Sequence, residues 1–118
     1  DEGSGCEPWF IPSTIDIPVL QSEESQYVEK LEAGLLELEK KTPKPDIAII
    51  VQGSDPFEHD ELLSSDQLNL TIDDMKKRDQ LVHQFLKERG IPQCYVIAGG
   101  YGKRAHEPYI EFFKYILA

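Results

Sequence analysis

The sequence predicts an α/β protein with a mainly parallel sheet, and two observations carry this prediction. The runs 47–51 and 94–97 are short and apolar without polar alternation, which is typical of strands covered on both faces of a parallel sheet. The segment between them places apolar residues at helical spacing. A strand, helix and strand in this order indicate parallel strands joined by a right-handed crossover.

The amino-terminal elements are predicted from turn residues and from hydrophobic periodicity. Residues 1–13 are expected to be irregular because glycine and proline recur there. Residues 14–19 alternate like a short strand, which Pro18 restricts to an edge or an end of a sheet. A helix is expected next, with Ser22 as its cap and Pro43 just beyond its end.

The remaining elements follow the same rules. The stretch 53–70 has no clear periodicity, and a loop of that length in a compact domain is usually functional or disordered. Thr71 with Asp74 resembles a capping box that opens a helix, and Gly90 closes that helix. A last helix begins near Pro108. The predicted order is therefore β-α-β-α-β-α, with three strands in one domain.

Composition excludes some function classes. The 118 residues carry a formal charge of −10 with a pI near 4.6, which argues against binding a nucleic-acid backbone. Residues 1–61 hold 15 acidic and 4 basic residues, a net charge of −11. This acidic half either forms a solvated face or attracts a cationic ligand such as a lysine-bearing peptide or a polyamine. Without a secretory or membrane-spanning run, the chain is expected in the cytoplasm, or in the nucleus if it is eukaryotic. Cys6 and Cys94 are expected to be free thiols, with Cys94 buried.

The candidate functional residues follow the ends of the two apolar strands. Asp55 comes after the first strand and Tyr101 after the second, so parallel pairing would place both at one edge of the sheet, where open α/β sheets bind ligands. A loop carboxylate at this place serves as a metal ligand or general base, or it only caps its own turn. Asp60 is a supporting or turn residue, and His59 a weaker metal-ligand candidate.

The second loop combines glycines with a phenol. Gly99 and Gly100 allow a sharp turn and a close approach to a bound group. A Tyr101 hydroxyl held there could donate a hydrogen bond to an oxyanion, or the ring could simply pack on the sheet edge. No Lys-Ser/Thr pair follows the glycines, so a phosphate-binding loop is disfavoured. His83 and His106 show no partner in the sequence.

Taken together, these segments resemble the C-terminal portion of the zinc-dependent histone deacetylase and acetoin-utilization family, which includes acetylpolyamine amidohydrolases. The resemblance implies a partial three-layer αβα domain of the arginase/deacetylase-like type over residues 14–118, with 1–13 as an irregular amino-terminal segment. The matching segments, in order, are 45–60, 68–71, 77–79, 89–92 and 98–101.

The resemblance also implies roles for individual residues. Asp55 matches a zinc ligand, and Tyr101 matches the tyrosine that donates its hydroxyl to the developing oxyanion. Leu62, Gly99 and Gly100 match positions that shape the substrate channel. The implied reaction is removal of an acetyl group from acetyl-lysine or a related acetylated amine, and the implied partners are an acetylated lysine peptide or an acetylated polyamine. From the acidic composition and the lack of an apolar spanning run, neither nucleic acid nor a membrane is expected as a partner.

The chain departs from the family pattern in ways that limit these implications. His59 and Ala98 stand where the family usually has glycine. The family's Asp-x-His motif, which supplies two more zinc ligands, and its tandem histidines do not occur in these 118 residues. Because catalytic zinc normally needs three protein ligands, the zinc site is incomplete, and we expect the isolated chain to be inactive.

Three explanations of this incompleteness remain open. The chain is a C-terminal piece of a longer protein, it is separated from a second chain that carries the rest, or it has lost activity and kept the fold. We favour the first two, which require a missing N-terminal part or a partner chain. The rival hypothesis is a non-catalytic α/β scaffold or interaction module.

Overall fold

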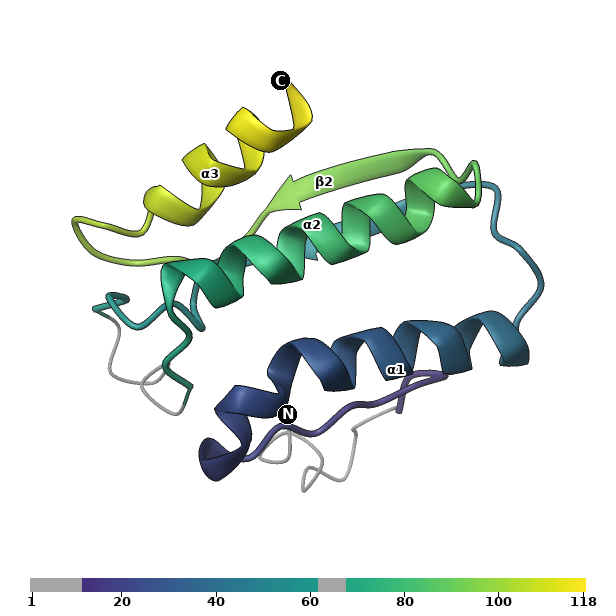
Figure 1. Cartoon of the computed structure of the whole chain (residues 1–118), viewed down its shortest axis with the longest axis horizontal. Coiled ribbons are helices and arrows are strands. Elements are labelled where there is room, and N and C mark those ends of the chain that lie inside the picture. The colour runs from purple at the N-terminus through teal and green to yellow at the C-terminus, as the bar shows by residue number, and fades with distance from the viewer. Residues whose placement is uncertain (1–11, 62–67) are drawn as a thin grey trace. The chain divides into compact units, whose positions relative to one another are not determined.

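The computed structural model describes residues 12–61 and 68–118 and shows a partial α/β fold, as the sequence predicts. The chain divides into two compact units, Asp1–Lys44 and Pro45–Ala118. In chain order, the elements of the described residues are a 3-10 helix η2 (Gln21–Gln26), α1 (Tyr27–Lys41), β1 (Ala48–Gln52), α2 (Ile72–Glu88), β2 (Gln93–Ile97) and α3 (Glu107–Ile116) (Figure 1).

In the first unit, the predicted strand at 14–19 is wrong. This segment lies along α1 without pairing in a sheet. Ile17 packs on Gly34, where a β-carbon would overlap the isoleucine side chain, and Lys30 Nζ donates to the Pro18 carbonyl at 3.1 Å. An alternating pattern buries one side of an extended chain equally well against a helix or within a sheet, so alternation alone could not separate the two.

The predicted start of the first helix is also wrong. The chain enters α1 through η2, and the turn begins after Leu20, not at Ser22. The Glu23 carboxylate accepts the Leu20 N–H at 3.1 Å and pairs with Lys30 at 2.7 Å. The hydrogen bond from Lys30 is the main reason that the pKa of Glu23 is lowered. The predicted end before Pro43 is correct.

In the second unit, β1 and β2 form a parallel two-stranded sheet, with Ile49 opposite Cys94 and Val51 opposite Val96. Alternate residues of β2 contact the helices: Tyr95 packs on Phe112 of α3, with ring centroids 4.7 Å apart. Gln93, two positions earlier, bonds to α2. Since residues i and i+2 share a face of a strand, α2 and α3 cover the same face.

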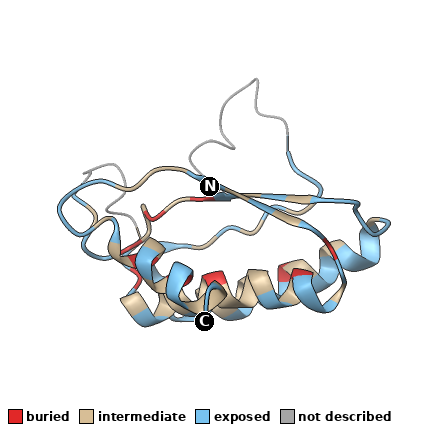
Figure 2. Cartoon of the chain, turned by 90° about the horizontal axis from the view of Figure 1, so that it is seen from above, coloured by how far each residue is buried: buried red, intermediate tan, exposed pale blue. Residues whose placement is uncertain are grey.

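The opposite face of the sheet is exposed, contrary to the expectation that both faces are covered. Ile49, Val51 and Val96 are 67%, 73% and 44% exposed, and Cys94 on this face is an exposed free thiol. Figure 2 shows most of both strands coloured as exposed or intermediate. The prediction that Cys94 is buried is therefore wrong, and no described helix of the second unit covers this apolar face of the sheet.

The core lies between the helices and the long loop after β1. Phe57, Leu70, Met75 and Phe112 are each at most 2% exposed. Phe57 and Leu70 form a parallel bridge outside the main sheet, and Leu70 N–H donates to the Pro56 carbonyl at 2.7 Å. Burial of these large apolar side chains fixes both ends of the loop that carries Asp55.

The ends of α2 and α3 agree with the sequence. Thr71 Oγ1 accepts the Asp74 N–H, and the Asp74 carboxylate accepts the Thr71 N–H, each at 3.2 Å. Gly90 ends α2 with a φ of 65°, and Pro108 lies in the first turn of α3. None of the helices in the described residues has both the length and the apolar character to cross a membrane.

Candidate functional site

The loops that follow β1 and β2 begin side by side at the carboxyl end of the sheet. The Ser54 N–H donates to the Gly99 carbonyl at 2.7 Å, and the Ala98 N–H donates to the Gln52 carbonyl at 3.2 Å. The hydroxyl of Tyr109 on α3 lies 2.8 to 3.3 Å from the carbonyl oxygens of Gln52, Ala98 and Gly99, so its single proton is shared among them. Helix α3 thereby ties the two strand ends together.

Asp55 lies at this edge with its carboxylate against two glycines. A β-carbon on Gly99 would overlap both carboxylate oxygens, and one on Gly53 would lie 3.1 Å from Oδ1. The half-buried carboxylate makes no hydrogen bond or ion pair with the described residues. Its position is thus set by backbone packing, while its oxygens keep their capacity to bind a ligand.

Tyr101 is held by its main chain and not by its side chain. Its N–H donates to Asp60 Oδ2 at 2.7 Å, and its carbonyl accepts the Glu61 N–H at 3.0 Å. The Glu61 carboxylate accepts the Lys103 N–H at 2.5 Å. The Tyr101 side chain is 47% exposed, and its hydroxyl has no hydrogen-bond partner within ranges 12–61 and 68–118. The phenol is therefore available to a bound group.

Gly100 packs against a buried hydroxyl. Ser54 is fully buried, and its Oγ donates to the Ala105 carbonyl at 3.0 Å. A β-carbon on Gly100 would overlap that oxygen, and the φ of 153° at Gly100 also disfavours any other residue. The glycines therefore let the two loops approach each other. Their predicted role in shaping a substrate channel stays a prediction, and Leu62, the third predicted channel residue, lies outside the described residues.

The remaining candidates have different outcomes. His59 packs edge-on against Phe57 with ring centroids 5.2 Å apart, and its Nε2 lies 3.5 Å from a Glu58 oxygen. Asp60, expected as a supporting or turn residue, holds the main chain of Tyr101. His83 has a partner that the sequence did not reveal: its Nδ1 lies 3.0 Å from Gln93 Oε1.

The described residues do not provide a complete zinc site. They contain no group of three His, Cys, Asp or Glu side chains placed to hold a metal ion. Asp55 would supply one carboxylate, whereas a catalytic zinc normally has three protein ligands. The donor set therefore does not fit a whole zinc centre, and Asp55 can serve only as part of one.

The sequence predicts no functional role for some residues that contribute to the site. Arg78 and Asp79 form a buried pair beside the Asp55 loop, although the sequence marks them only as part of a matching segment. Tyr109 lies in α3, and its hydroxyl contacts the carbonyls at the strand ends. Two adjacent opposite charges within an amphipathic helix, and a tyrosine within its apolar face, are the signals that could have been used.

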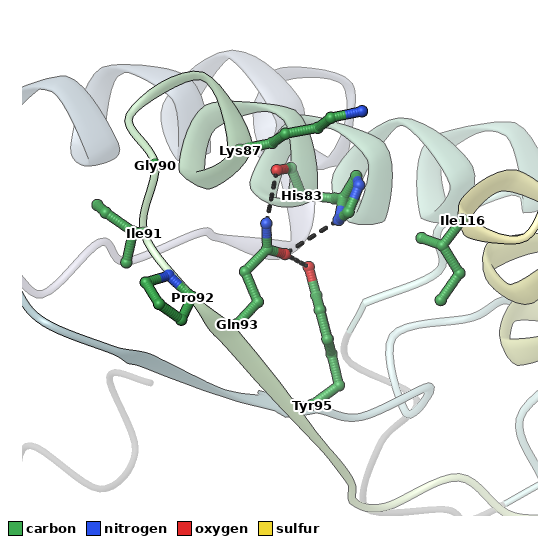
Figure 3. Close-up of a pocket in the computed structure, with 8 residues that line it drawn as sticks. All are labelled: His83, Lys87, Gly90, Ile91, Pro92, Gln93, Tyr95 and Ile116. Carbon is green, nitrogen blue, oxygen red and sulfur yellow. Dashed lines mark hydrogen bonds between the residues drawn. The ribbon is translucent and has the colours of Figure 1, made fainter.

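A second polar cluster lies at the other end of β2, beside a cavity of about 520 Å³ (Figure 3). Gln93 Nε2 donates to the His83 carbonyl at 3.1 Å, which orients the amide so that Oε1 faces His83 Nδ1 at 3.0 Å and the Tyr95 hydroxyl at 2.5 Å. Because Oε1 only accepts, Nδ1 of His83 carries the proton. Burial, followed by the nearby Asp79 carboxylate, raises the pKa of Tyr95 to about 12.

Comparison with known proteins gives one family. The family model of the histone deacetylase domain matches residues 10–114, which is most of the chain. No solved structure matches the chain.

Proposed function

Because the chain belongs to the histone deacetylase domain family, we propose that it forms part of an amidohydrolase site that removes acetyl groups from acetyl-lysine or a related acetylated amine. The observation that carries this proposal is the pairing of the two loops. They hold the Asp55 carboxylate and the Tyr101 phenol at one edge of the sheet, each without a side-chain partner among the described residues.

Tyr101 has the chemistry for the oxyanion. As an amide carbonyl is attacked, negative charge develops on its oxygen, and a positioned hydroxyl that donates to this oxygen lowers the barrier. The main chain of Tyr101 is fixed by Asp60 and Glu61. This support reduces the reorganisation needed before the phenol can donate, which is the condition for effective electrostatic stabilisation.

Asp55 is proposed as one ligand of a zinc ion, which in amide hydrolysis polarises the carbonyl. The other ligands and the general base would come from polypeptide outside these 118 residues, because the sequence lacks Asp-x-His and tandem histidines. The isolated chain is therefore proposed to be inactive. The formal charge of −10 favours a cationic substrate, which includes a lysine peptide and a polyamine.

A second candidate function is a scaffold that keeps the fold without catalysis. The exposed apolar residues Ile49, Val51 and Val96 favour it, since a contiguous exposed apolar surface often marks an interaction site. The two functions differ in metal content. A scaffold needs no zinc, whereas the proposed amidohydrolase binds about one zinc ion per completed site.

The experiment compares the 118-residue chain with the same chain joined to any polypeptide encoded upstream of it. Zinc content and deacetylation of an acetyl-lysine peptide and of an acetylated polyamine are measured for both. We expect activity only in the longer form. There, Tyr101→Phe should lower kcat by roughly 10²–10³-fold, the usual effect of losing one oxyanion donor.

Tyr115→Phe is the matched control, because the Tyr115 hydroxyl contacts Gln84 and lies outside both loops. Its turnover should equal that of the unmodified protein. An unchanged rate in Tyr101→Phe would remove the phenol from the mechanism. A longer form with neither zinc nor activity would favour the scaffold.

A further inference from the structure

Arg78 of α2 links the helix to the loop that carries Asp55. Its Nη1 donates to the Gly53 carbonyl at 2.7 Å, and its Nε donates to Asp79 Oδ1 at 2.8 Å. The Asp79 side chain is buried and that of Arg78 is mostly so, with 5% and 11% exposed. The guanidinium therefore contacts a carboxylate and a loop carbonyl at the same time.

The Arg78–Asp79 ion pair has a desolvation cost that an apolar pair at the same positions would not have, so we expect it to fill a role that only the charged pair can fill. Burying two charges carries a desolvation penalty that is offset only by good geometry and further hydrogen bonds, and apolar residues of similar volume often stabilise a protein more. The additional bond made here goes to the peptide immediately before Ser54 and Asp55. Asp79 fixes the guanidinium, and the guanidinium in turn fixes the loop.

We propose that Arg78, oriented by Asp79, is a positioning residue that sets the direction of the Asp55 carboxylate. The Gly53 carbonyl precedes Asp55 by two residues, and Gly53 and Gly99 bound the carboxylate on two sides. The N–H of the same peptide, that of Ser54, donates to the Gly99 carbonyl, so the bond from Arg78 is one of two that hold this peptide. Its loss should loosen the peptide and shift the carboxylate that follows. The catalytic meaning of this position rests on the proposed function, whereas the position itself does not.

The substitution Arg78→Lys keeps the positive charge and changes the geometry of the hydrogen-bond donors. Its ammonium is a point charge on a flexible stem, so it can pair with Asp79 but does not reproduce the planar fork that reaches both acceptors. Arg78→Lys should therefore keep the buried pair and lose the bond to Gly53. Arg89→Lys is the matched control, because Arg89 also donates to a backbone carbonyl, that of Phe85, at the other end of α2.

The test uses NMR of the 118-residue chain. We expect Arg78→Lys to shift the side-chain carboxyl ¹³C resonance of Asp55 and to speed amide exchange at Ser54 by roughly 10- to 100-fold, the range expected for loss of a charge-assisted hydrogen bond. Exchange in the middle of α2 should change much less. Arg89→Lys should leave both loop signals unchanged.

Methylguanidinium provides a second route, which also serves if Arg78→Lys does not fold. Added to Arg78→Ala, it should restore the Asp55 resonance, whereas methylammonium should not. An Asp55 resonance and a Ser54 exchange rate that stay the same in Arg78→Lys would overturn the proposal, as would equal rescue by both cations. The proposed function fails by a different result, an unchanged turnover in Tyr101→Phe.

Discussion

The two ends of the β1–β2 sheet use polar side chains in opposite ways. At the amino end of β2, His83, Gln93 and Tyr95 hydrogen bond to one another. At the carboxyl end, side chains hydrogen bond to the main chain of the loops, as Asp60 does to Tyr101. The first arrangement engages the side chain of each member with another member, whereas the second leaves the functional groups of Asp55 and Tyr101 without a partner among the described residues.

This difference distinguishes the cavity beside Gln93 from the candidate binding site at the loop end. The 520 Å³ cavity beside Gln93 is large enough for a small ligand, yet the Gln93 amide facing it already has partners for both its oxygen and its nitrogen. At the loop end, neighbouring residues fix the backbone, while the side chains of Asp55 and Tyr101 have no partner among the described residues. Preorganised backbone with free side chains is what a binding site requires.

The largest effect expected on stability is at Gly100. Gly100→Ala should lower the free energy of unfolding by about 1–3 kcal/mol, because the new β-carbon meets the buried Ser54 hydroxyl at a strained φ. Gly99→Ala should cost about 1 kcal/mol, since the Asp55 carboxylate can rotate away. Urea denaturation measures both. A larger cost at Gly99 would show that Asp55 is fixed more firmly than the backbone around Ser54.

Removing the hydroxyl of Tyr109 should have an effect of intermediate size on stability, and removing that of Tyr101 a much smaller one. Tyr109→Phe removes the hydroxyl shared by the carbonyls at both strand ends and should cost about 1 kcal/mol. Tyr101→Phe should change stability by less than about 0.5 kcal/mol, because that hydroxyl has no partner among the described residues. Thermal and urea unfolding of the two variants test this contrast. Equal losses would mean that the Tyr101 hydroxyl is engaged in the folded chain and is not free for a ligand.

The smallest expected effect is a pH dependence of stability that arises from Tyr95 near the amino end of β2. It is measurable only at alkaline pH. Burial raises the pKa of Tyr95 to about 12 from its ordinary value of 10.0, so between these pH values the unfolded chain has lost a proton that the folded chain retains. The contribution of Tyr95 to stability is complete below pH 10 and is lost as pH rises through about 12. The stability difference between the unmodified chain and Tyr95→Phe should narrow over this window, and parallel curves would contradict the burial of Tyr95.

Much of the second unit could be predicted because its signals are local. Hydrophobic periodicity located α2 and α3, and the Thr71–Asp74 cap and Gly90 marked the ends of α2. The parallel pairing of the strands then brought the loops of Asp55 and Tyr101 to one edge. The roles of these two residues remain predictions, since position alone does not establish chemistry.

The rest depended on tertiary contacts that no local pattern contains. The bond from Arg78 to the Gly53 carbonyl joins residues 25 positions apart, and only the crossover geometry places them together. Cys94 was expected to be buried because its strand is apolar, but burial depends on what covers each face of the sheet. The strand prediction for residues 14–19 was wrong for the same reason, since Ile17 contacts Gly34 of a helix and not a neighbouring strand.

The contact between Ser54 and Gly99 spans 45 residues of sequence, with the whole of α2 between them. Closing a loop of that length has an entropic cost before any contact compensates it, and such non-local pairings slow folding. We therefore expect the Asp55 loop to meet Gly99 only after the local helices have formed. Mutations that slow the crossover should delay the appearance of a competent site without altering any residue in it.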